Sequence, residues 1–196
     1  MRRNLNLGRR AILLITALFS VSYAMALTID TLDVTSQGRT FKVQMKLEIA
    51  APVDQIVAVL TDYRYPDRLS AKVTKKNVIS RSEGITRVRI EFRSCVFLYC
   101  KQLTLTQDVT ANAGVIYAET IPELSDFLSG SMRWLVSPDG NGGSHIVYFA
   151  VMEPDIFIPP FIGEPLIRTR LRREMLEIAE NLESEASRQP ALDKNQ

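Results

Sequence analysis

The stretch PPFIGEPLIRTRLRREMLEIAENLESEA, residues 159–186, decides the fold of this chain. Prolines and a glycine open it, and neither residue type occurs again from Leu166 to Arg188. Apolar side chains then recur every three or four residues, at Ile167, Leu171, Met175, Ile178 and Leu182, with Ala179 beside them. This spacing predicts one long helix with a single apolar stripe. Pro165 suits its first turn, where a missing N–H costs nothing.

The residues before this helix follow the alternation of β-strands. From Phe41 to Ile49, apolar and polar residues alternate without interruption, which predicts a half-buried strand. Weaker strand patterns lie within residues 27–34, 76–82, 87–93, 103–109, 115–121, 127–136 and 145–152. Turns of hairpin length separate most of them, so the pattern predicts an antiparallel sheet.

Helical spacing follows the first long strand. Pro52 or Val53 opens a short helix that ends near Tyr63, and a second short helical segment is expected after the turn at Tyr65–Leu69. The chain therefore predicts an α+β arrangement: a curved antiparallel sheet, two short helices after its first long strand, and a long C-terminal helix across the sheet. Such an arrangement leaves an apolar pocket between helix and sheet. The side chains expected to line it are Phe41, Val43, Met45, Leu47, Trp134, Phe149, Ile167, Leu171 and Met175.

The first 26 residues have the layout of a bacterial export signal. Four arginines, at positions 2, 3, 9 and 10, precede the apolar run Ala11–Phe19, and Ala24-Met25-Ala26 forms an A-x-A cleavage site. The apolar run is too short to cross a membrane as a helix. We expect cleavage after Ala26, one domain over residues 27–188, a flexible tail over residues 189–196 and a periplasmic location. An uncleaved membrane anchor is the alternative.

Removing this segment changes the charge balance. The whole chain has 24 Lys and Arg residues against 22 Asp and Glu, and loss of the four N-terminal arginines leaves 20 against 22. A slightly acidic domain lacks the basic excess of a nucleic-acid-binding protein, so we expect no nucleic-acid partner. Ten Lys and Arg residues nevertheless lie between Arg64 and Lys101, against three acids. They form either a solvated outer sheet face or a surface attracted to an anionic membrane or an acidic partner.

Two cysteines, Cys95 and Cys100, flank the apolar segment Val96–Tyr99. In one continuous strand their Cα atoms would lie about 16 Å apart, beyond the reach of a disulfide. In a hairpin with a four-residue loop they would face each other, and an exported protein would keep them oxidised. We expect the disulfide. The apolar tip either borders the ligand entrance and touches lipid, or folds under a neighbouring helix.

The sequence offers little for catalysis. His145 is its single histidine, and it contains no Ser–His–Asp arrangement, metal-ligand cluster or phosphate-binding loop, so we expect no metal and no cofactor. Asp62 and Tyr63, with Asp126, are weak candidates for acid–base chemistry, and Asp62 has the alternative role of orienting the junction after the short helix. The arginines at 168, 170, 172 and 173 either pair with glutamates of the long helix or hold an anionic head group at the pocket mouth.

Residues 49–63, IAAPVDQIVAVLTDY, resemble the opening of START-like helix-grip proteins. This superfamily, SRPBCC, includes polyketide cyclases/dehydrases and coenzyme Q-binding START proteins. Gly130–Trp134, Val147-Tyr148, Glu153-Pro154 and the proline-led last helix agree, so the resemblance covers Leu32 to Ala186. It implies a cavity for a lipid, an isoprenoid quinone or a polycyclic compound. It does not imply one activity, because one fold hosts many functions.

Three functions fit these features. The first is binding or carriage of a hydrophobic small molecule in the periplasm without chemistry, with peripheral contact to an anionic membrane. The second is a cyclase or dehydratase that uses the same pocket and Asp62 or Tyr63. The third is an interaction module without a pocket. Our prediction is the first.

Overall fold

The computed structural model describes residues 27–96, 98–156 and 163–188. The expected export signal, its cleavage site and the C-terminal tail lie outside these residues, as does Phe97 at the apolar tip.

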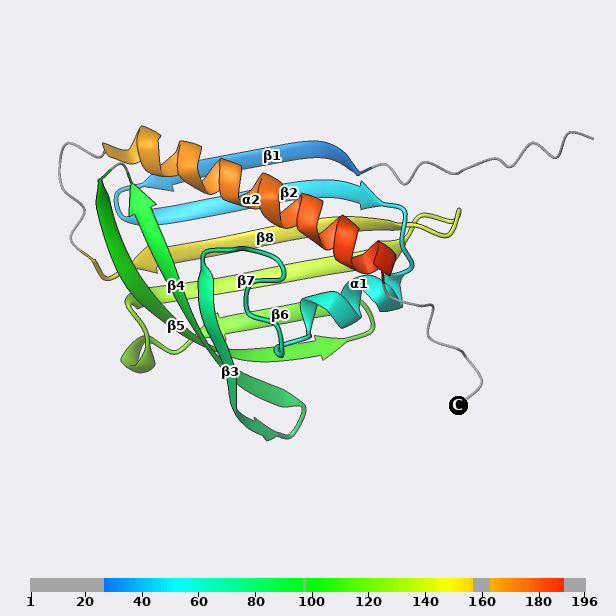
Figure 1. Ribbon diagram of the computed structural model, residues 1–196, viewed down its shortest axis with the longest axis horizontal. Coiled ribbons are helices and arrows are strands. Elements are labelled where there is room, and N and C mark those ends of the chain that lie inside the picture. Colours follow the sequence, from blue (N-terminus) through cyan, green and yellow to red (C-terminus); the bar gives the residue numbers. More distant parts are fainter. Residues whose placement is uncertain (1–26, 97, 157–162, 189–196) are drawn as a thin grey trace, which may run out of the picture.

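One sheet and two α-helices make up the described chain (Figure 1). The strands are β1 (Thr28–Gln37), β2 (Thr40–Ile49), β3 (Val73–Ser82), β4 (Ile85–Val96), β5 (Tyr99–Asn112), β6 (Val115–Thr120), β7 (Phe127–Pro138) and β8 (Ser144–Pro154). The helices are α1 (Val53–Leu60) and α2 (Gly163–Arg188), and a 3₁₀ turn, η1, covers Pro122–Leu124. This confirms the predicted α+β fold.

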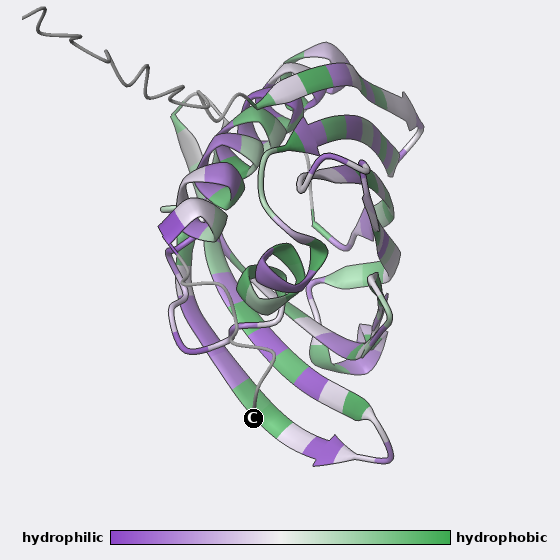
Figure 2. Ribbon diagram, turned by 90° about the vertical axis from the view of Figure 1, so that its right-hand side faces the viewer, coloured by the Kyte–Doolittle hydropathy of each residue, from purple (hydrophilic) through white to green (hydrophobic). Residues whose placement is uncertain are grey.

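The sheet has eight strands in the order β1-β2-β8-β7-β6-β5-β4-β3 and is not closed. All seven neighbouring pairs are antiparallel. Strands β3 to β8 form an antiparallel meander, and β8 then pairs with β2. The strands curve around the side that the helices cover (Figure 2). The sheet therefore has a concave inner face and a convex outer face.

Strand β2 has the burial that its sequence predicts. Every second side chain from Phe41 to Ile49 is buried, and those between are exposed. Because β2 lies between β1 and β8, its buried side chains form the centre of the core beneath α2. Residue Ser144, at the start of β8, is fully buried with them and donates a hydrogen bond to the Ala51 carbonyl at 2.7 Å. That bond fixes the start of α1 against the sheet.

Helix α2 runs along the concave face and contacts β1, β2, β4 and α1 (Figure 1). Its buried residues are Met175, Ala179, Leu182 and Ala186. Leu171 and Ile178, also on the predicted stripe, are only half-buried. The stripe is thus packed tightly toward the C-terminal end and loosely toward the N-terminal end. Among the described residues, neither helix has the length and apolar character needed to span a membrane.

The second short helix expected after Tyr65–Leu69 is not formed. Residues 64–72 are a series of turns between α1 and β3. Two causes are visible. Pro66 disfavours helical geometry at the residue before it, and the Leu69 carbonyl accepts a hydrogen bond from the Asn181 side chain of α2 at 3.1 Å instead of an intrahelical partner.

The two cysteines form the expected disulfide. Strands β4 and β5 are a hairpin in which Cys95 faces Cys100, with a Cα–Cα distance of 4.0 Å. Pairing continues one step further, to residues 96 and 99, so the loop has two residues where four were expected. The continuous-strand alternative is therefore wrong.

Candidate ligand-binding site

A partly open cavity of about 210 Å³ lies between α2 and the concave face of the sheet. Sites for drug-sized molecules usually have volumes of roughly 300–1,000 Å³, so this one is small. It suits a compact apolar molecule, or one end of a longer ligand whose remainder extends out through the open side.

Most of the lining is apolar. The sheet contributes Val43, Phe92, Leu105, Phe127, Met132, Tyr148, Ala150 and Met152, and α2 contributes Leu171, Met175 and Ile178. These residues come from five strands and one helix that are distant in sequence. The cavity lies where the stripe of α2 packs loosely, so the sheet curvature and the helix create it together.

Three of the nine expected lining residues, Val43, Leu171 and Met175, border the cavity. Four others face the same side of the sheet but are packed into the core and are at most 5% exposed, namely Phe41, Met45, Leu47 and Trp134. Trp134 lies against the ring of Tyr148, with 4.3 Å between ring centroids. Ile167 is half-buried one turn before Leu171 and does not border the cavity.

The ninth residue, Phe149, lies on the face of the sheet opposite to the one that the sequence predicted. In β8 the side chains of Ile146, Tyr148 and Ala150 are buried, whereas Phe149 is 43% exposed. Its neighbour on β2 is Gln44, whose side chain is also exposed. Successive residues of a strand point to opposite faces, so Phe149 belongs to the convex outer face.

Two polar residues of the cavity, Gln107 and Thr120, were not among those that the sequence predicted to line a pocket. They are cross-strand neighbours on β5 and β6 and are only 5% and 7% exposed. The sequence does indicate that Gln107 faces inward, because it lies between Leu105 and Val109 and residues two apart in a strand share a face.

The rim of the cavity carries one carboxylate, Glu174 of α2. It accepts a hydrogen bond from the Ser70 hydroxyl and forms an ion pair with Lys72. Lys72 also lies 3.5 Å from Glu177, and burial lowers the pKa of its ammonium group. Glu174 is therefore held by the turns between α1 and β3 and does not point freely into the cavity.

Further contacts fix these turns to α2. The Arg68 guanidinium lies 2.9 Å from Glu185 and 2.9 Å from Asp62. Among the described residues, Glu174, Glu177 and Glu185 of α2 thus pair with the turns before β3, and not with the arginines at positions 168, 170, 172 and 173. Arg172 donates instead to the Leu32 carbonyl of β1.

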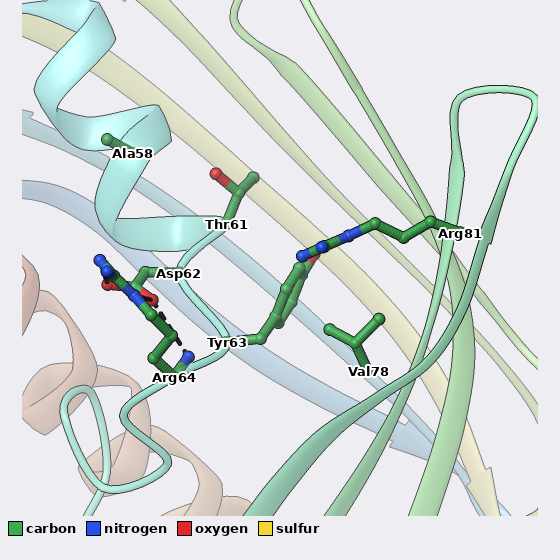
Figure 3. A pocket seen from close by; sticks show the side chains of 7 residues that line it. All are labelled: Ala58, Thr61, Asp62, Tyr63, Arg64, Val78 and Arg81. Carbon is green, nitrogen blue, oxygen red and sulfur yellow. Dashed lines mark hydrogen bonds and ion pairs between the residues drawn. The ribbon is translucent and has the colours of Figure 1, made fainter.

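Asp62 and Tyr63 lie outside the apolar cavity. They border a separate, open hollow of about 470 Å³ between the end of α1 and β3, together with Ala58, Thr61, Arg64, Val78 and Arg81 (Figure 3). Although this hollow has the larger volume, its polar and open walls do not shield an apolar ligand from water. The Asp62 carboxylate turns toward Arg64, and the Tyr63 ring turns toward Val78 and Arg81 (Figure 3).

The Asp62 carboxylate has a structural role as the partner of two arginines. Both of its oxygens lie 2.9 Å from the Arg64 guanidinium, and its side chain is only 7% exposed. Hydrogen bonds from Arg64, with a contribution from Arg68, lower the pKa of the carboxyl group from 3.8 to about 2. Burial raises the pKa of Tyr63, so its phenol stays protonated at neutral pH. Neither group is suited to exchange protons near pH 7, and the two do not face each other.

The remaining candidates also have structural partners. The Asp126 carboxylate accepts from the Thr104 backbone N–H at 2.7 Å, and His145 pairs with Glu48 at 3.0 Å on the outer face. Arg87 of the basic stretch pairs with Asp108 of β5 at 2.7 Å. This partial neutralisation agrees with a solvated outer face for that stretch.

An eight-stranded curved sheet that grips a C-terminal helix above an apolar cavity defines the helix-grip class of ligand-binding folds. The family model described as polyketide cyclase/dehydrase and lipid transport matches residues 40–187. The chain therefore belongs to that family, as the resemblance predicted.

Solved structures agree on the fold. An aromatase/cyclase from Streptomyces sp. R1128 is 18% identical with a TM-score of 0.59, and the match covers 76% of this chain and 94% of that one. A START superfamily protein from Mycobacterium smegmatis is 15% identical (TM-score 0.60; 74% and 97% covered). A STAR-related lipid transfer protein from Xanthomonas axonopodis is 12% identical (TM-score 0.58; 81% and 100% covered). A search of curated proteins found no match.

The pairing of Asp62 predicts a pH dependence of stability. Because its pKa in the folded protein is below the ordinary value of 3.8, the ionised carboxylate stabilises the fold above about pH 4, and this contribution is lost as the pH falls through 2. Asp62→Asn should lower the free energy of unfolding at pH 7 by about 1 kcal/mol, less than the full pKa shift implies because solvent screens the exposed Arg64.

Urea unfolding between pH 2 and pH 7 measures this effect. The difference between wild type and Asp62→Asn should shrink as the pH falls below about 4 and be small at pH 2. Asp67→Asn, on an exposed residue of the same loop, is the control and should change little. A constant difference at every pH would mean that Asp62 acts through something other than its charge.

Proposed function

We propose that this protein is an exported carrier that binds a hydrophobic small molecule in the cavity between α2 and the sheet. A lipid, an isoprenoid quinone or a polycyclic compound fits this description. The observation that carries the proposal is the partly enclosed, mostly apolar cavity in a chain of the polyketide cyclase/dehydrase and lipid transport family. Transfer of apolar surface from water into such a cavity is favourable by roughly 25 cal/mol per Å².

The lining favours carriage over cyclisation. Among the described residues that border the cavity, Tyr148 and Glu174 are the ionisable ones. Burial raises the pKa of Tyr148 far above neutrality, and Glu174 is bound by Ser70 and Lys72. Acid–base catalysis requires a group that exchanges protons near the working pH. The earlier candidates Asp62 and Tyr63 are in the other hollow, so the cavity holds a ligand without reacting with it.

Two features support export to the periplasm. The first is the signal-like segment over residues 1–26, with its arginines, apolar run and A-x-A site. The second is the Cys95–Cys100 disulfide, because disulfides persist in oxidising compartments and are rare in the cytosol. The two are independent, since one is a targeting pattern and the other a covalent bond in the fold.

Contact with an anionic membrane is the way we propose that the ligand is exchanged. Leu98, at the tip of the β4–β5 hairpin, is 89% exposed. Arg93 and Lys101, in the strands beside it, are also exposed. An apolar tip next to basic residues favours insertion into the surface of a membrane with acidic lipids.

Cavity binding is tested by filling the cavity from the helix side. Wild type should bind the neutral apolar probe N-phenyl-1-naphthylamine, and Leu171→Trp should weaken that binding at least tenfold because the larger ring occupies the space. Leu166→Trp, at an exposed position five residues earlier on α2, is the matched control and should bind like wild type. Equal binding by wild type and Leu171→Trp would remove the cavity as the site.

Export is tested on protein purified from its own periplasm. Its intact mass should correspond to a chain that begins at Leu27. Thiol labelling under denaturing, non-reducing conditions should modify neither cysteine, because both are in the disulfide. Protein that retains Met1 and occurs only in membranes, or that labels at two thiols, would contradict the proposed location.

Membrane contact is tested by co-sedimentation with vesicles that contain phosphatidylglycerol. Leu98→Ser should reduce binding several-fold without changing the thermal melt, because the residue has almost no protein contacts to lose. Ile79→Ser is the control, since Ile79 is also exposed but lies on β3, away from the tip. The same loss in both variants would indicate nonspecific hydrophobic adsorption to the vesicles. No loss in Leu98→Ser would exclude the hairpin tip as the membrane-binding site.

A further inference from the structure

We propose that Gln107 and Thr120 form a hydrogen-bonding subsite that selects hydrophobic ligands carrying an uncharged carbonyl or hydroxyl group. This inference rests on the function proposed above and narrows the class of ligand. It concerns the two polar side chains that β5 and β6 present side by side at the cavity wall.

Neither side chain has a hydrogen-bond partner in the described part of the protein. Gln107 is 5% and Thr120 is 7% exposed, and neither side chain makes a hydrogen bond with another side chain or backbone group of the described residues. An amide offers two donors and an acceptor, and a hydroxyl offers one donor and an acceptor. Among the described residues, the buried side-chain nitrogen and oxygen atoms without a hydrogen-bond partner are Arg89 Nε and Glu183 Oε1. The polar atoms of Gln107 and Thr120 therefore keep access to the cavity, where water or a ligand can pair with them.

The surroundings keep the pair directed at the cavity. On the side away from Thr120, Gln107 faces Val88 of β4, which is fully buried and offers no polar side-chain atom. Thr120 lies against Gly130 of β7, where a Cβ atom would be only 2.6 Å from the Thr120 hydroxyl oxygen. The glycine therefore leaves the hydroxyl its space at the cavity wall.

The charge of the lining restricts the ligand group. Among the described residues that border the cavity there is no lysine, arginine or histidine, and the carboxylate of Glu174 lies at the rim. An ionised group placed beside Gln107 would be desolvated without an opposite charge, which is costly. A carbonyl or hydroxyl accepts or donates the missing hydrogen bonds without that cost.

Two matched pairs of probes test the subsite. 2-Acetylnaphthalene and 2-isopropylnaphthalene have nearly the same shape, but only the ketone accepts a hydrogen bond. Wild type should bind the ketone at least tenfold more tightly than the hydrocarbon, and 2-naphthoate, which is charged, should bind more weakly than the ketone. Thr120→Val and Gln107→Met should each reduce the preference for the ketone and leave hydrocarbon binding equal or stronger.

Thermal melts of the protein without added ligand give an independent readout. If the two side chains serve a ligand, Thr120→Val and Gln107→Met should melt at the same or a higher temperature, because neither side chain has a hydrogen bond within the described part of the protein to lose. A structural role predicts the reverse. Thr106→Val is the matched control, since Thr106 is buried on the same strand but donates to the Leu124 carbonyl at 2.7 Å. It should melt lower and keep the preference for the ketone.

The possible results separate the two proposals. If neither neutral probe binds wild type, both the carrier function and the subsite are wrong. If ketone and hydrocarbon bind equally, or if 2-naphthoate binds best, the cavity is a ligand site but the subsite is overturned. A ketone preference that survives both substitutions would place the selecting group elsewhere.

Discussion

The packing of α2 against the concave face of the sheet is the contact on which the rest of the structure depends. Its C-terminal half is tight because Ala179 and Ala186 are small enough to be fully buried between larger neighbours, and Leu182 fills the space between them. Leu171, in its N-terminal half, and Ile178, near its middle, are half-buried and border the cavity. One helix cannot cover the inner face of eight curved strands, so the uncovered part becomes a cavity at the loosely packed end.

The sequence predicted the sheet well where one face of a strand is polar. In β2 the lysines, glutamine and glutamate between the apolar residues leave no doubt about which face is buried, and the burial follows the pattern. In β8 both faces are apolar: Ile146, Tyr148 and Ala150 alternate with Val147, Phe149 and Val151. Alternation cannot choose between such faces, so Phe149 was assigned to the pocket although it belongs to the outer surface. The pairing register of β8 with β2 and β7 determines which of its faces is buried, and this register depends on residues far away in the sequence.

The site was predicted only in part, for a related reason. Val43, Leu171 and Met175 could be placed because helix stripe and strand alternation both point to the space between them. Whether an inward side chain borders a cavity or fills the core depends on what packs opposite, which a local pattern does not contain. Asp62 illustrates the same limit of local patterns. Its partner Arg64 is two residues away in the sequence. The turns that bring Arg68 and Lys72 to α2, however, are held by residues more than a hundred positions later, namely Asn181, Glu174 and Glu185.

The two polar residues in the cavity wall, Gln107 and Thr120, are better explained by ligand binding than by a contribution to stability. Of the six buried polar residues among the described ones, three have a partner: Ser144 and Thr106 donate to the Ala51 and Leu124 carbonyls, and Ser70 donates to Glu174. Gln107 and Thr120 lack such a partner among the described residues, and they are next to each other at the cavity wall and not scattered through the core. Apolar residues at both positions would pack there at lower cost. In the proposed function, their polarity acts through what enters the cavity, and this pair, not the charged hollow around Asp62, is the part of the molecule that would distinguish one hydrophobic ligand from another.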